Sequence, residues 1–157
     1  MRERHPGKQV TVCRPTRPRQ AGFESIYEFG AVEPLTGRRS ALFAPEANTE
    51  WPAEHLAALS REPGGDEVAV YVHDNAAWHT TARLKWPANI IPLALPPYCP
   101  DLNPIERLWL HLREEFLSNR MHKDYDALLE ALQAAFDGTT QETIMSVCRT
   151  AWLRPVS

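Results

Sequence analysis

Apolar and polar positions follow two patterns along the chain, and together they predict an α/β domain. Short runs rich in β-branched and aromatic residues, typical of strands, alternate with segments in which apolar residues recur at helical spacing. The predicted strands are 23–33, 40–44, 68–73 and 89–95, and the predicted helices are 50–61, 78–85, 104–119, 124–136 and 140–149. Strands that alternate with helices indicate an α/β architecture.

The third predicted strand ends at an acidic residue. Val68–His73, VAVYVH, is almost continuously apolar, which is typical of a strand buried on both faces. Asp74 follows it directly, and α/β folds usually bind their ligands where such strands leave the sheet. The next strand, Asn89–Leu95, contains Pro92, which confines it to an edge or an end of the sheet.

The segment Leu95–Glu106, LPPYCPDLNPIE, contains four prolines in twelve residues. Each proline fixes its own backbone dihedral and restricts the residue before it, so this loop has few conformations to lose. Asn103 suits a helix cap and Pro104 suits the first helical position. The loop is therefore predicted to deliver Glu106, in the first turn of the helix, to a defined point, as a metal-binding carboxylate requires.

Structural roles are also open to these residues. Asn103 and Glu106 have the spacing of a capping box, in which the Glu106 side chain would accept from the Asn103 backbone N–H. Asp74 could serve as a turn or cap residue, and His79 could be a histidine on a helix surface.

Composition indicates a globular chain with an uneven charge distribution. Hydrophobic residues make up 43% of its 157 residues, and no apolar run approaches the roughly 20 residues of a membrane span. Its three cysteines, Cys13, Cys99 and Cys148, form no CxxC pair, which supports neither a disulfide framework nor a zinc site and favours a reducing cytoplasm.

The first twenty residues are basic. Residues 1–20 carry a net charge of +5 and the rest of the chain carries −8. We interpret 1–20 as an extended arm and 21–157 as the folded domain. Arg14, Arg17 and Arg19 could contact DNA phosphates, although a solvated tail would have the same composition.

Two motifs in this order resemble those of a known family. DNAAWH (Asp74–His79) and LPPYCPDLNPIERLW (Leu95–Trp109) resemble the catalytic domain of insertion-sequence transposases of the IS630 and Tc1/mariner superfamily. YEFGAVEPLTG (Tyr27–Gly37) is more weakly similar to the second strand of that domain and its turn. The resemblance covers residue 23 to about 152, and Cys99 replaces the serine usual in the loop.

The resemblance implies an RNase H-like mixed sheet flanked by helices and a DDE triad that binds two Mg²⁺ or Mn²⁺ ions. By position, Asp74 matches the second acid and Glu106 the third, with Asn75, His79 and Asn103 as supporting residues. The implied activity is DNA cleavage and strand transfer during transposition. The implied partners are transposon ends and target DNA, with a homo-oligomer or a full-length transposase as a further partner and a location in the cytoplasm or on the nucleoid.

The family's first acid has no counterpart in the sequence. HPGKQVTV (His5–Val12) resembles the segment that follows the first strand, and no aspartate occurs before Asp66. We therefore expect a truncated domain that lacks its first central strand and is inactive alone. The gap would lie between the 23–44 hairpin and Val68–His73, with Val10–Cys13 available as a substitute strand.

Two other functions fit the same residues. A non-catalytic module could pair with a full-length transposase or bind DNA weakly through the basic arm. A metal-dependent nuclease could use a substitute acid such as Glu24 or Glu28.

Overall fold

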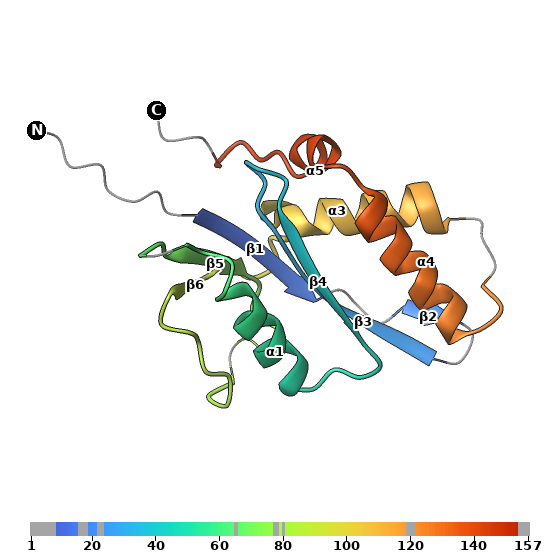
Figure 1. Cartoon of the computed structure of the whole chain (residues 1–157), viewed down its shortest axis with the longest axis horizontal. Coiled ribbons are helices and arrows are strands. Elements are labelled where there is room, and N and C mark those ends of the chain that lie inside the picture. The colour runs from blue at the N-terminus through green and yellow to red at the C-terminus, as the bar shows by residue number, and fades with distance from the viewer. Residues whose placement is uncertain are drawn as a thin grey trace, which may run out of the picture.

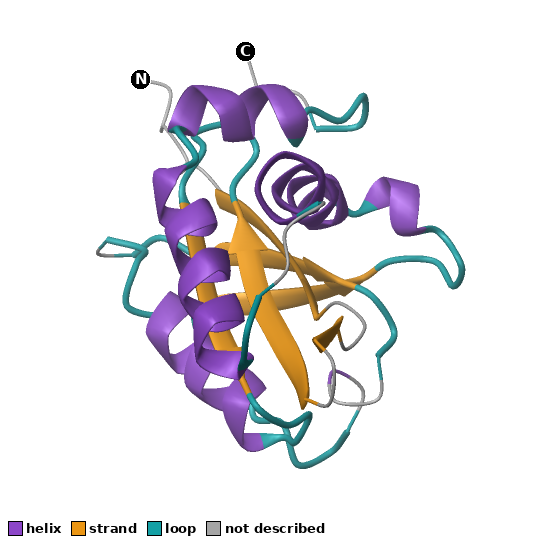
Figure 2. Cartoon of the chain, turned by 90° about the vertical axis from the view of Figure 1, so that its right-hand side faces the viewer, coloured by secondary structure: helices purple, strands orange, loops and turns teal. Residues whose placement is uncertain are grey.

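A six-stranded sheet forms the middle layer of the protein, with helices on both faces (Figures 1 and 2). The computed structural model describes residues 9–15, 19–21, 24–64, 66–76, 79, 81–118 and 122–153, and their side chains from residue 26 onward. The strands are β1 (Gln9–Pro15), β2 (Arg19–Ala21), β3 (Glu24–Val32), β4 (Arg39–Ala44), β5 (Ala69–His73) and β6 (Ile90–Ala94). The helices are α1 (Glu50–Leu59), α3 (Pro104–Leu112), α4 (Tyr125–Gly138) and α5 (Gln141–Val147).

The sheet is mixed. β3 pairs antiparallel with β4 on one side and with β1 and β2 on the other, and β1, β5 and β6 run parallel. This arrangement confirms the predicted RNase H-like sheet, including the 23–44 hairpin, the strand before Asp74 and the edge position of the strand that contains Pro92.

The centre of the sheet differs from the expected gap. β1 lies between β3 and β5, with Val12 beside Val32 on one side and Val72 on the other. The expectation of an open gap is therefore wrong, and Val10–Cys13 lies within the strand that fills it, as the substitute-strand hypothesis predicted. Facing strands on both sides offer backbone hydrogen-bond partners, and leaving such groups unpaired in a core is costly. β1 and β2 fall mostly within residues 1–20, which the sequence predicted to be an extended arm.

Alternate residues of β5 face two different hydrophobic cores. Val72 packs with Ile105 and Leu108 of α3, in a core to which α4 and α5 also contribute. Tyr71 packs on the opposite face with Leu56 and other residues of α1. The continuous apolar character of β5 therefore reflects burial on both faces, as predicted.

The helices agree with the predicted segments, with one exception. A π-helical turn, Arg113–Leu117, follows α3, and Asp124 and Thr140 cap α4 and α5 through their side chains. The helix predicted over 78–85 is absent from residues 81–85 of the described chain. There the Thr81 hydroxyl accepts the N–H of Arg83 (3.3 Å) and the Thr81 carbonyl accepts the N–H of Leu84 (3.1 Å), which makes a turn in place of a helix.

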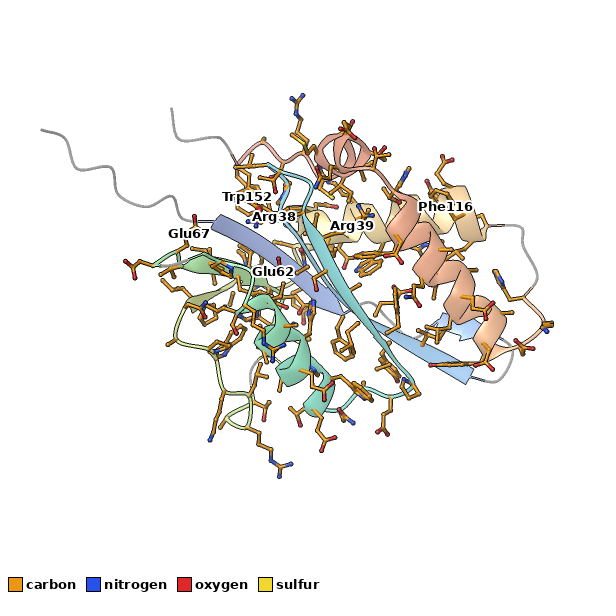
Figure 3. All side chains as sticks on the ribbon, viewed as in Figure 1. Arg38, Arg39, Glu62, Glu67, Phe116 and Trp152 are labelled. Carbon is orange, nitrogen blue, oxygen red and sulfur yellow. The ribbon has the colours of Figure 1, made fainter. Side chains whose placement is uncertain are left out.

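The β3–β4 hairpin is fixed to the end of α4. Arg39, labelled in Figure 3, donates from Nη2 to the carbonyl of Asp137 (2.6 Å), and its guanidinium lies 5.3 Å from the centre of the Phe136 ring. Gly37 has φ of +73°, a conformation that favours glycine, and lies close to Gln141. None of the described helices is both long enough and apolar enough to cross a bilayer.

Candidate active site at the carboxyl edge of the parallel strands

Asp74 lies at the edge where the parallel strands β1, β5 and β6 end. It follows the last residue of β5, and the neighbouring pair in the register is His73 beside Cys13. Its side chain is 29% exposed, and Oδ1 accepts the backbone N–H of Ala76 (3.1 Å). The turn role considered for Asp74 is therefore present, and it holds the carboxylate in one orientation at the edge of the sheet.

The proline-rich loop is tied to the same edge. The N–H of Leu95 donates to the carbonyl of His73 (2.7 Å), and Asn75 Nδ2 donates to the carbonyl of Leu95 (2.9 Å). Asp74 and Asn75 line an open groove of about 590 Å³ together with loop residues that include Tyr98 and Asn103. The structure thus brings together three of the predicted site residues, Asp74, Asn75 and Asn103.

Glu106 lies one helical turn beyond Asn103. Its N–H donates to the Asn103 carbonyl (3.1 Å), and its Oε1 atom is buried. The Asn103 side chain makes no capping hydrogen bond. The backbone N–H of Asn103 donates to the carbonyl of Pro100 (2.9 Å). The half of the capping box in which the Asn103 side chain would cap the helix is therefore absent from the described residues 103–106. Glu106 is not among the residues that line the groove around Asp74.

His79 is a buried histidine beside Asp74. It is 5% exposed, so the alternative of a surface histidine is wrong. Its Nε2 lies 3.8 Å from Asp74 Oδ1. Burial, reinforced by the nearby His73 and His55, lowers the pKa of His79 to about 3. His79 is therefore neutral near neutral pH, and it contacts Asp74 without compensating the charge of the carboxylate.

An aromatic cluster behind Asp74 includes residues that the sequence analysis did not single out. The His73 ring lies 4.8 Å from His79 and stacks on Trp86 at 5.4 Å, and Tyr71 packs against Trp86 at 5.5 Å. His73 Nδ1 also lies 2.5 Å from the carbonyl oxygen of Asp74. The alternation of Tyr71 and His73 along β5 was a usable signal, because residues two apart on a strand share a face. The contact with Trp86 had no such local signal.

A complete three-acid site is not found in the described part of the chain. No group of three or more His, Cys, Asp or Glu side chains is arranged there to hold a metal ion. The substitute acid Glu28 is buried in β3, at 5% exposure, and it belongs to no such group. Arg14 and Arg19 lie in β1 and β2, whereas Arg17 and the side chains of Arg14, Arg19 and Glu24 lie outside the described set. Asp74 and Glu106 are oxygen donors of the type that Mg²⁺ and Mn²⁺ prefer, but they do not complete a site.

Sequence comparison identifies the family. The model of the DDE superfamily endonucleases matches residues 3–129, most of the chain. The chain belongs to the DDE endonuclease superfamily. Membership of this superfamily implies the use of a divalent metal ion. A relative from Sinorhizobium fredii (strain NBRC 101917 / NGR234), uncharacterized protein y4pE/y4sA, is 41% identical over 128 residues, which cover 80% of this chain and 95% of the relative.

Solved structures confirm the fold of this DDE-family chain. The Mos1 transposase catalytic domain with raltegravir and Mg superposes with a TM-score of 0.66 at 17% identity, covering 89% of this chain and 76% of that domain. The Mos1 chain in its strand transfer complex gives 0.65 at 16% identity, covering 89% of this chain and 50% of the Mos1 chain. This chain therefore spans about half the length of that Mos1 protein. The likeness confirms that this chain has the fold of the Mos1 transposase catalytic domain.

Proposed function

We propose that this chain is a transposase catalytic domain that acts on DNA, with Asp74 and Glu106 as the second and third acids of its metal site. The observation that carries the proposal is the junction at the carboxyl edge of the sheet. Asp74 leaves β5 there, and the loop that leads into α3 is hydrogen-bonded to the end of the same strand. Two acids 32 positions apart in the sequence are thus linked through one rigid connection.

The surrounding residues suit this role. Ala76 restrains the Asp74 carboxylate through its N–H, and neutral His79 packs beside that carboxylate. Asn75 fixes the loop through the Leu95 carbonyl. Glu106 stands in the first turn of α3, where the helix dipole favours negative charge. A bound Mg²⁺ or Mn²⁺ ion would supply the activation of a water or a DNA 3′-hydroxyl.

The proposal includes incompleteness of the site. Since a third acid is not grouped with these two in the described residues, we expect no transposition by the isolated chain. Action on transposon ends and target DNA would then depend on a homo-oligomer or a full-length transposase. The same proposal locates the protein in the cytoplasm, associated with the nucleoid when DNA is bound.

Metal binding tests the assignment directly. Mn²⁺ affinity is measured by titration calorimetry for the parent chain, Asp74→Asn and Glu106→Gln, with exposed Glu114→Gln as the matched control. We expect affinity to fall on the order of tenfold or more in the two site variants, because changing even the outer-shell residues that orient metal ligands typically costs about 10–100-fold. The control should bind as the parent does. Parent-like Mn²⁺ binding by both site variants would refute the assignment.

Plasmid nicking separates the proposal from the nuclease alternative. Supercoiled plasmid is incubated with Mn²⁺ and the same four proteins. No cleavage by the isolated parent chain is the expected result. Nicking that both Asp74→Asn and Glu106→Gln abolish would mean that a further acid completes the site within this chain, as the nuclease alternative requires.

A further inference from the structure

Tyr98 is a fully exposed aromatic residue at the centre of the proline-rich loop. Its relative exposure is 101%, whereas the other large exposed hydrophobic residues of the described chain lie between 38% and 50%. Tyrosine is usually at least partly buried, because its ring gains free energy from contact with other groups. A tyrosine ring presented wholly to solvent is therefore available for a contact with a partner.

The backbone at Tyr98 is held in an unfavourable conformation. Its φ is +60°, the only positive φ among the described non-glycine residues, and the chain turns at Pro97–Tyr98. Turns with a positive φ at this position usually contain glycine or asparagine, because a side chain with a Cβ is strained there. The adjacent prolines stiffen the loop and keep this conformation. Such strain concentrates at ligand-binding sites.

The position of the ring connects it to the proposed site. Tyr98 lines the same groove as Asp74 and Asn103. The loop is fixed to the end of β5 by hydrogen bonds to Leu95, so the ring has a defined location relative to Asp74.

The chemistry of the loop indicates which part of a ligand it would contact. Leu95–Pro100 contains no charged residue, so it offers no cation to a phosphate. A single ring also presents far less area than the roughly 800 Å² per partner of a stable protein interface. One exposed aromatic face matches one nucleobase, and stacking of bases on aromatic side chains tolerates any sequence.

We propose that Tyr98 stacks on an unpaired nucleobase of the DNA, next to the phosphate that faces Asp74. This inference rests on the proposed function, because it assumes that DNA occupies the groove. It makes Tyr98 a DNA-binding residue that positions the strand, and not a participant in the chemistry.

Two oligonucleotides measure the contact. One is a duplex with a three-nucleotide single-stranded 3′ end that carries 2-aminopurine, and the other is the matching blunt duplex. Binding is followed in Ca²⁺ for the full chain and for Tyr98→Phe, Tyr98→Gly and Tyr98→Asn. The Phe variant keeps the ring, whereas the Gly and Asn variants remove it and tolerate the positive φ.

The parent chain and Tyr98→Phe should quench 2-aminopurine and bind the overhang duplex on the order of tenfold tighter than the blunt duplex, the scale of one stacked base. Tyr98→Gly and Tyr98→Asn should lose the quenching and the preference, with a melting temperature at or above that of the parent. A purely structural Tyr98 would instead lower the melting temperature. That result would overturn the inference, as would retained quenching in the ring-less variants or the absence of a parent preference.

The outcomes separate this inference from the proposed function. Loss of Mn²⁺ binding in the Asp74 and Glu106 variants, combined with quenching that does not depend on Tyr98, would refute the stacking role alone. Quenching that depends on Tyr98 without a metal site at Asp74 and Glu106 would refute the proposed acids and keep the stacking role. Self-association that depends on Tyr98, measured by sedimentation, would refute the stacking role in favour of a protein contact.

Discussion

Gly30 and Trp109 make a close contact between the sheet and the helix that carries Glu106. A Cβ atom placed on Gly30 of β3 would lie 2.3 Å from Cζ2 and 2.9 Å from Cη2 of Trp109. Trp109 is 3% exposed and stacks on Phe136 at 5.9 Å, so its ring has no free space to enter. Gly30→Ala would therefore displace the ring, and with it α3.

The cost follows from two opposing terms. Overpacking a core by a methyl group typically costs about 1–3 kcal/mol. Replacing glycine by alanine inside a strand stabilises the folded state by roughly 0.5–1 kcal/mol, because alanine loses less conformational entropy on folding. We expect Gly30→Ala to lower the free energy of unfolding by about 1–2 kcal/mol in urea titrations followed by circular dichroism. The corresponding fall in Tm is about 2–8 °C for a chain of this size.

A double-mutant cycle tests the mechanism. Trp109→Phe removes the outer ring that Gly30→Ala would strike, at a cost of its own because it leaves a cavity. In the double variant the new methyl group occupies part of that space. The loss of stability in the double variant should therefore be smaller than the sum of the two single losses by about 1 kcal/mol or more. Gly64→Ala is the matched control, since nothing lies within 4 Å of its Cβ position. Additive costs, or a Gly30→Ala variant as stable as the control, would refute the packing argument.

Three further outcomes are expected. Gly37→Ala should lower the free energy of unfolding, measured in urea, by about 2–4 kcal/mol, because φ at this position is +73° and the new Cβ would lie 2.5 Å from the Gln141 carbonyl oxygen. A variant as stable as the parent would contradict this. Burial lowers the pKa of His55 to about 4, so between pH 6.5 and pH 4 the unfolded chain binds a proton that the folded chain does not. The free energy of unfolding should therefore be highest above pH 6.5 and fall by on the order of 3 kcal/mol towards pH 4. Urea unfolding measured against pH should show a smaller fall in His55→Gln. Half-exposed Cys99 should react with a thiol reagent in the native protein, whereas Cys148, buried and with its pKa raised to about 12, should react only on unfolding; peptide mapping that finds Cys148 labelled first would contradict this.

The elements whose signals are local were predictable from the sequence. The hairpin, β5 and α3 each carry their own pattern: a turn glycine between two strands, a continuous apolar run, and apolar residues at helical spacing after Asn103-Pro104. The position of Asp74 at the end of a buried strand was equally local, whereas Asn75 and Asn103 were indicated by the family resemblance; all three line one groove in the structure.

Features that depend on distant contacts were not predictable in the same way. The pairing of β1 with β5 joins segments about sixty residues apart, and the short run QVTVC does not indicate its partner. The helix predicted over 78–85 does not include residues 81–85, because the Thr81 hydroxyl stabilises a turn there that helical spacing does not reveal. Burial of His79 against His73 and Trp86 likewise arises only when the segments pack.

The central position of β1 has a consequence for biosynthesis. Gln9 pairs with Ala69, so a ribosome releases β1 well before its parallel neighbour has been made. Contacts of such long range slow folding, because the intervening chain must be ordered before they form. The β3–β4 hairpin can form as it emerges, whereas the sheet closes only after translation has passed His73. During that interval the unpaired strands are exposed to aggregation, so soluble yield in the cell should rise when a holding chaperone is abundant.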